Sequence, residues 1–310
     1  MTNKEDMATT GVKNPAKINQ SLSTLVLRRK RFFISFLIIW AAMILFAPMP
    51  IPELIDYSLF SLLGILGAIF ANSTGAGGGV IFIPMFNQLN FTELQSVATS
   101  FSIQCFGMTA GAITWYLHYH KEKTELRLWQ GFKRIILITS LTSIIGVWAV
   151  YGFNIASPSS LHHSFSWFSL LLGLFIVFTV YFAKPHRERS QIHIVDWLVI
   201  VLIGLFGGAL TAWLSVGVGE IIAIYLIVRR FDVTMAVAVA VVVSAITVWA
   251  SIWQHTLIDF QVVWQVTIFA GPSAVIGGIL AKSLVTRLSA TRLKVFFAFW
   301  LLVIGGVGIS

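Results

Sequence analysis

The feature that most constrains this chain is a succession of apolar segments, many of them long enough to cross a membrane, along almost all of its 310 residues. A helix of about 20 apolar residues spans the roughly 30 Å hydrocarbon core of a bilayer. Only 11% of the residues are charged, whereas soluble domains carry about 25%. The sequence therefore predicts an all-α polytopic membrane protein, with apolar segments near 32–47, 54–71, 79–87, 94–118, 130–152, 165–183, 194–213, 220–228, 233–255, 261–281 and 293–309.

The basic residues are confined to some of the connections between these segments. All 21 lysines and arginines lie within five stretches, namely 1–31, 121–134, 184–189, 229–230 and 282–294. None lies in 47–56, 87–93, 152–164, 213–216, 255–261 or the C-terminal end. Because lysine and arginine in short loops mark the cytoplasmic side, we expect a cytoplasmic (inner) membrane protein with its N-terminus inside and its C-terminus outside. This asymmetry accounts for the net charge of +9 without a nucleic-acid partner; a nucleic-acid-binding arm is the less favoured alternative.

Two of the segments, 79–87 and 220–228, are too short to span a membrane, since nine residues rise only about 13 Å as a helix. Each follows a glycine-rich break. Shifting the chain by 140 residues places Gly77 on Gly217 and Gly79 on Gly219, and the order of long and short segments repeats as well. An internal duplication is the simplest explanation.

The two halves are predicted to be inverted relative to each other. Each contains five elements, an odd number, and only an inverted second half leaves every basic stretch on one side. Inverted repeats with broken helices at matching positions are typical of secondary transporters. We predict four parts: a basic cytoplasmic tail (1–31), an extra transmembrane helix (32–52), repeat 1 (53–189) and an inverted repeat 2 (190–310). Whether the short half-helices are re-entrant or partial crossings stays open.

The residues around the first break resemble the sulfite exporter TauE/SafE family. The resemblance rests on Gly64-Ile-Leu-Gly67, on Gly75-Ala-Gly77-Gly78-Gly79-Val-Ile-Phe-Ile-Pro84, and on Ala98-Thr99-Ser100. It covers roughly 54–310. The second half departs from the family pattern, with Gly217-Val-Gly219-Glu220 at the break, Ile224 opposite Pro84 and Ala240 opposite Ser100. The resemblance implies a transporter of small sulfur oxyanions or organosulfonates, and not an enzyme.

The paired breaks are predicted to bind the substrate anion. A half-helix that begins inside the membrane leaves up to four backbone N–H groups without intrahelical partners, and these carry partial positive charge. Glycine lets an oxyanion approach them closely. The residues expected at the breaks are Asn72, Ser73, Thr74, Gly75, Gly77, Gly78, Gly79, Ser215, Gly217 and Gly219; those on the following helices are Thr99, Ser100, Gln104, Ser244 and Thr247. Thr99 and Ser100 enter this set through the family resemblance. The alternative is that the glycines only allow close helix packing.

Glu220 is the acidic residue that stands out. The other acids lie in the N-terminal tail, in loops or at segment ends, whereas Glu220 adjoins a glycine break and precedes an apolar run. A charge in hydrocarbon costs about 3 kcal/mol on insertion scales and is a functional candidate by default. We expect Glu220 to carry a proton coupled to transport; an interfacial glutamate or a direct cation site are the alternatives. His255, at the end of its segment, is expected to be interfacial.

The sequence as a whole predicts a secondary transporter that exports a small anion. A single cysteine, Cys105, excludes a disulfide framework, and neither a metal nor a cofactor is expected. The expected partners are the anion and the lipid bilayer, with homo-oligomerisation left open. The rival predictions are a channel, a transporter of another substrate class coupled to cations or protons, a membrane-embedded enzyme and a scaffold. Hydrolase and nucleotide-binding motifs are absent from the sequence, so an ion or substrate gradient would supply the energy.

Overall fold

The computed structural model describes residues 30–31, 33–46, 50–121, 129–157, 160–182, 191–287 and 290–307, and every regular element among them is a helix. The chain divides into two units, Met1–Met49 and Pro50–Ser310. Of the first unit, the structure describes an apolar helix, Phe33–Leu45, within the predicted extra segment 32–52. The predicted tail lies outside the described residues, except for residues 30 and 31 at the start of this helix.

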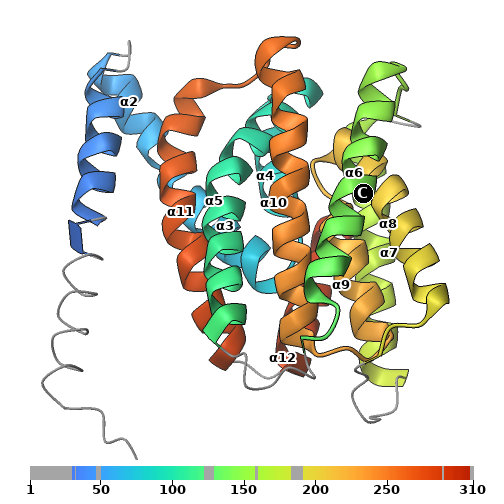
Figure 1. Ribbon diagram of the computed structural model, residues 1–310. Coiled ribbons are helices and arrows are strands. Elements are labelled where there is room, and N and C mark those ends of the chain that lie inside the picture. Colours follow the sequence, from blue (N-terminus) through green and yellow to red (C-terminus); the bar gives the residue numbers. More distant parts are fainter. Residues whose placement is uncertain are drawn as a thin grey trace, which may run out of the picture. The chain divides into compact units, whose positions relative to one another are not determined.

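The second unit is a bundle of long helices with two short ones inside it (Figure 1). Its helices are α2 (Ile51–Ser58), α3 (Phe60–Thr74), α4 (Gly79–Gln88), α5 (Glu93–Lys121), α6 (Phe132–Gly152), α7 (Leu161–Phe182), α8 (Ile194–Leu214), α9 (Val218–Val228), α10 (Val233–Leu257), α11 (Trp264–Arg287) and α12 (Ala290–Val307). The predicted segment 54–71 is two consecutive helices, α2 and α3, which meet at Leu59. The short helices α4 and α9 have 10 and 11 residues and follow the two glycine breaks.

Among the described residues, five stretches are long and apolar enough to cross a membrane, which makes this a multi-pass membrane protein. They are Ile51–Thr74, Phe132–Gly152, Ile194–Leu214, Val233–Leu257 and Trp264–Val285. Large apolar side chains face outward, among them Leu62 on α3 and Leu141 on α6. Helix α10 lies in the interior: it is 78% buried over its most apolar window, with a fully enclosed run of alanine and valine at 236–241. The bundle therefore exposes many large apolar side chains, as a surface that faces lipid requires.

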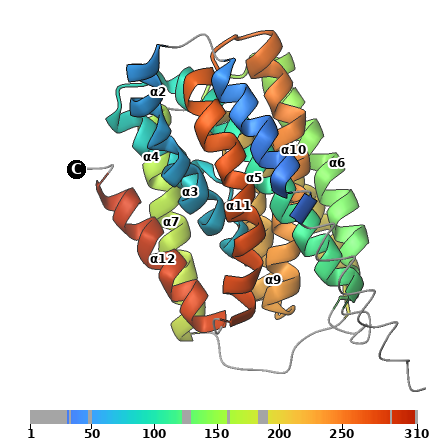
Figure 2. The ribbon, with the colours of Figure 1, turned by 90° about the vertical axis from the view of Figure 1, so that its left-hand side faces the viewer.

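The long helices pack in pairs. The pairs are α3 with α11, α6 with α8, α5 with α10, α7 with α12, α5 with α11 and α6 with α10; Figure 2 shows α7 beside α12. Glycines let the backbones approach at two crossings, because a Cβ at Gly64 would collide with the carbonyl oxygen of Ala270, and one at Gly146 with that of Leu205. Close approach through small residues is how membrane helices gain packing energy.

Basic residues gather at one end of the bundle. Tyr119 at the end of α5, Lys133 at the start of α6 and Trp197 at the start of α8 line one pocket there. Arg229, just after α9, reaches the same end, since its Nε lies 2.7 Å from the Asp196 carboxylate in the first turn of α8. The adjoining basic stretches at 122–128 and 184–189 lie outside the described residues.

Asp196 forms several hydrogen bonds at this end of the bundle. Its carboxylate is fully buried and accepts hydrogen bonds from the His193 N–H at 2.8 Å, the Tyr225 hydroxyl at 2.7 Å and Arg229 Nε at 2.7 Å. The carboxylate also raises the pKa of the Arg229 guanidinium above its usual range, so Arg229 stays charged at physiological pH. The bonds join the start of α8 to the end of α9.

Asp196→Ala is expected to lower the free energy of unfolding by about 2–3 kcal/mol, because it removes a helix cap and the acceptor of the bonds from Tyr225 and Arg229. In detergent this should lower the Tm by roughly 4–10 °C. The matched control is Asp56→Ala on α2, where the side chain is exposed. Equal melting of the two variants would show that the Asp196 bonds contribute no stability.

Candidate functional site

The candidate site is the point where the two glycine breaks meet inside the bundle. The first break begins at Gly75, whose φ is +82°, and the second at Ser215, whose φ is +58°. These residues are 140 positions apart in the sequence. The left-handed conformation ends α3 and α8 and lets the chain re-enter helix as α4 and α9 after a few residues. Both breaks are buried.

Glu220 joins the breaks. Its Oε1 accepts a hydrogen bond from the Gly77 N–H at 2.7 Å, and its Oε2 accepts one from the Gly217 N–H, also at 2.7 Å. The side chain is only 1% exposed. An ionised carboxylate offers two acceptor oxygens, and here each receives a donor from a different half of the chain. Backbone N–H groups of both breaks therefore converge on one carboxylate of the protein itself.

Gln104 makes the second set of bonds between the breaks. Its Oε1 accepts from the Gly78 N–H at 2.8 Å, and its Nε2 donates to the hydroxyl oxygens of Ser215 at 2.8 Å and Ser100 at 3.0 Å. Ser215 Oγ also lies 3.0 Å from Ser100 Oγ. Gln104 thus connects the start of α4 to the end of α8 through side chains on α5.

Two further backbone donors at the breaks are also paired. The Val218 N–H donates to Thr211 Oγ1 at 3.0 Å, and the Ala76 N–H to Thr74 Oγ1 at 3.2 Å. Little space is left: a cavity of about 10 Å³ lies beside Asn72, Gly78 and Gln104, which is room for at most one water molecule. A substrate anion can reach these N–H groups only if the protein side chains move.

The structure brings together seven of the predicted site residues and places others apart. Those in the Glu220–Gln104 network are Gly77, Gly78, Ser100, Gln104, Ser215, Gly217 and Glu220. Gly219 packs against Ser244 and the carbonyl oxygen of Gly75, so these three lie beside the network, and Gly79 abuts the carbonyl of Ser215.

The other predicted residues satisfy nearby backbone groups. Asn72 Nδ2 donates to the carbonyl oxygens of Ala68 and Gly107, which directs the amide toward α5. The hydroxyls of Ser73 and Thr74 donate to the carbonyl of Phe70 within their own helix. Thr99 accepts from the Val263 N–H, and Thr247 pairs with Ser143; neither contacts the network.

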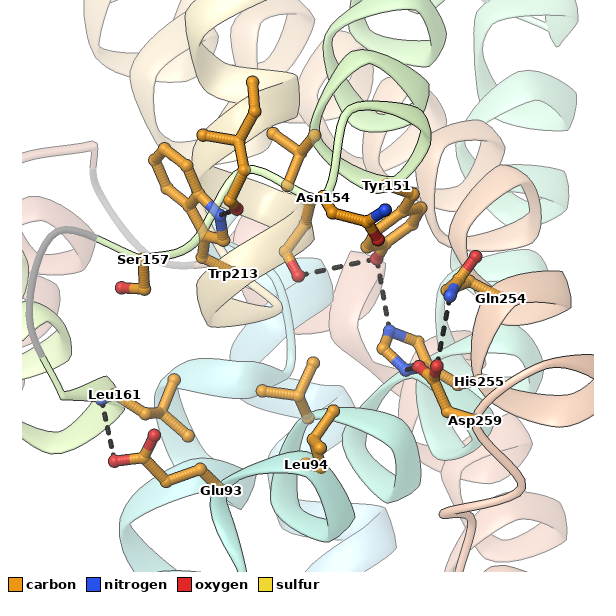
Figure 3. A pocket seen from close by; sticks show the side chains of 14 residues that line it. Glu93, Leu94, Tyr151, Asn154, Ser157, Leu161, Trp213, Gln254, His255 and Asp259 are labelled. Atoms are coloured by element: carbon orange, nitrogen blue, oxygen red, sulfur yellow. Dashed lines mark hydrogen bonds and ion pairs between the residues drawn. The ribbon is translucent and has the colours of Figure 1, made fainter.

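A second polar cluster lies at the end of the bundle opposite the basic residues, in a pocket of about 370 Å³ (Figure 3). The Tyr151 hydroxyl lies 3.1 Å from His255 Nε2, and His255 Nδ1 lies 2.9 Å from Asp259 Oδ2. His255 is 2% exposed: α6 brings Tyr151 over it, and the Phe101 ring stacks on its other side. The spacing of His255 and Asp259, four residues apart, was the available sequence signal.

In the part of the chain that the structure describes, no three histidine, cysteine, aspartate or glutamate side chains lie together as potential metal ligands. Cys105 is buried as a free thiol. The polar groups at the breaks are amide and hydroxyl groups around one carboxylate.

Comparison with known proteins gives one match. A family model described as Sulfite exporter TauE/SafE matches residues 59–307, which include both breaks, Gln104 and Glu220. Comparisons with curated proteins and with solved structures each find no match.

Proposed function

The chain belongs to the sulfite exporter TauE/SafE family, and from this premise we propose that it is a secondary transporter that exports a small sulfur oxyanion or organosulfonate across the cytoplasmic membrane. The family is one of membrane transporters, and membership implies a small-molecule substrate and a protein embedded in the bilayer. The proposed orientation puts the basic end of the bundle in the cytoplasm.

One observation carries the substrate class: a carboxylate bridges backbone N–H groups of both breaks at 2.7 Å. Donors arranged in this way are complementary to an oxyanion, because they supply partial positive charge without a lysine or arginine that would hold the anion too strongly to release it. A sulfonate or sulfite oxygen would take the place of a Glu220 oxygen. Gln104 and Ser215 would then rearrange around the remaining oxygens.

Glu220 is proposed to couple this exchange to protons. A charged Glu220 and a substrate anion compete for the same N–H groups and repel each other, so a bound anion favours a protonated or displaced Glu220. Export of a monovalent anion is in addition favoured by the membrane potential, by about 2.3 kcal/mol per 100 mV. Proton coupling would set the direction and extent of transport beyond that electrical contribution.

The inverted-repeat architecture is also proposed, with repeats at 53–189 and 190–310 after the extra helix at 32–52. The helix contacts support it: if α3 to α7 correspond to α8 to α12 in order, then the pair α3–α11 becomes α8–α6, and α5–α11 becomes α10–α6. The pairs α5–α10 and α7–α12 map onto themselves. Left-handed residues recur at the same spacing, with Asn90 and Arg230 after the short helices. These are the relations expected of a pseudo-two-fold axis.

The test is thermal unfolding of the purified protein with sulfite, sulfate, thiosulfate, sulfoacetate or taurine, and with mono- and divalent cations as controls. A ligand that binds only the folded state raises the Tm increasingly with concentration; at 100 times its Kd the gain is about 2.7 kcal/mol. We expect at least one sulfur anion to stabilise the protein and the cations to have no effect. Stabilisation by cations alone would instead make Glu220 the ligand of a cation site.

A further inference from the structure

The pocket in Figure 3 lies along the same two helices as the central site. On α5, Val97 lines the pocket, and Ser100 of the central network follows three residues later. At the end of α8, Ala212 lines the pocket and Ser215 follows three residues later. Three residues of helix rise about 4.5 Å. The pocket and the central site therefore share two helices, and on each helix their residues lie three positions apart in the sequence.

The charge of this pocket is opposite to that of the other end of the bundle. Glu93 and Asp259 line it from opposite walls, and its described lining residues include no lysine or arginine. At the other end, Lys133 and Arg134 line the pocket beside α5 and α8. An anion that travels through the bundle therefore moves from a basic entrance toward an acidic exit.

Both carboxylates are held in place by other groups. Glu93 Oε1 accepts a hydrogen bond from the Leu161 N–H at 2.9 Å. Asp259 accepts one from Gln254 Nε2 at 3.0 Å, in addition to its contact with His255. Neither carboxylate faces a lysine or arginine that would cancel its charge within the pocket.

We propose that this pocket is the water-filled outer vestibule of the transport path, and that Glu93 and Asp259 make it a poor site for anions and a favourable one for small cations. Two parts of this proposal rest on the proposed function: that the pocket lies on the outer side of the membrane, and that anions pass through it. At a separation of about 7 Å in water, one carboxylate lowers the local concentration of a monovalent anion about threefold and raises that of a cation as much. The exit side would thus release an exported anion and resist its return.

The test labels a cysteine in the pocket with thiol reagents of opposite charge. Ser157 lines the pocket and differs from cysteine by one atom, so the background is Cys105→Ala with Ser157→Cys. Cationic and anionic methanethiosulfonates of similar size are applied to sealed cells in low-salt buffer. Replacing either carboxylate, by Glu93→Gln or Asp259→Asn, should lower the cationic-to-anionic ratio of labelling rates roughly ninefold, and less in high salt.

The matched control is Ser58→Cys on the exposed α2, whose rate ratio should not respond to the two neutralising substitutions. An unchanged ratio at position 157, or a thiol there that reacts with neither reagent, would overturn the proposal. Glu93→Gln keeps the test valid if Asp259→Asn disturbs its neighbours.

A transport measurement then examines the consequence for affinity. In vesicles that carry the protein, external unlabelled sulfite should inhibit efflux of labelled sulfite at about threefold lower concentration in Glu93→Gln than in the wild type. An unchanged inhibitory concentration would contradict the effect on exit affinity. Absence of wild-type sulfite flux would count against the proposed substrate, whereas the labelling result would still decide the vestibule.

Discussion

A Gly78→Leu variant should carry no anion flux above that of empty vesicles. A Cβ at Gly78 would lie 2.6 Å from Phe82 Cε2 and 2.9 Å from Gln104 Cγ, so a leucine must displace the glutamine that pairs with the Gly78 N–H. The substitution removes a proposed substrate donor and fills the approach to it. Overpacking of this kind costs about 1–3 kcal/mol, which lowers the Tm by several degrees without preventing membrane insertion. Flux is measured in proteoliposomes with the anion found by thermal shift.

Two further variants make that result interpretable. Gly152→Leu adds the same side chain where no atom lies within 4 Å of the added Cβ, and it should transport normally. Gln104→Leu keeps the volume of position 104 but removes the polar link to Gly78 and Ser215, and it should reduce transport as well. Wild-type flux in an inserted, monodisperse Gly78→Leu protein would exclude the breaks as the anion-binding site.

Glu220→Gln is expected to abolish the response of transport to a pH gradient. A glutamine offers one acceptor oxygen in place of two, so either the Gly77 or the Gly217 N–H loses its partner and faces the amide NH₂. The loss of one bond to a charged group costs about 1.5–3 kcal/mol. Because glutamine cannot be ionised, exchange of anions should persist while imposed pH gradients no longer drive it.

The measurement is flux with the same anion under inward and outward pH gradients. Glu53→Gln on α2 removes an exposed carboxylate and should leave the response unchanged. If Glu220→Gln responds to the gradient as the wild type does, Glu220 has a structural role only, and another group or the membrane potential drives transport.

Much of the fold could be predicted from the sequence because apolar length and glycine are strong local signals. The short segment expected at 79–87 is α4, Gly79–Gln88, and the one expected at 220–228 is α9, which begins at Val218. Each begins after a glycine break, which separates it from the preceding helix and keeps it too short to cross the hydrocarbon core. The division between α2 and α3 was not predicted, although α2, with Glu53 and Asp56, is less apolar than α3.

The contacts of the candidate site could not be predicted from the spacing of apolar residues along the sequence. Gln104 and Thr211 lie within apolar helices, and nothing in their spacing shows that they meet the starts of α4 and α9. Asp196 was expected to be an acid at a segment end, yet it is buried because α9 brings Tyr225 and Arg229 to it. Partners far apart in the sequence decide the role of a polar residue in a membrane protein.

The shared carboxylate has a consequence for how the two halves move. Glu220 accepts a hydrogen bond from one N–H group of each break, so it links segments that belong to different halves. In the proposed transporter, protonation of Glu220 would weaken these two bonds, and a substrate oxyanion would compete for the same N–H groups. The protein without substrate would then be rigid, because Glu220 links its two halves. Binding of the substrate would break this link, so the halves could move and open the site to the other side of the membrane.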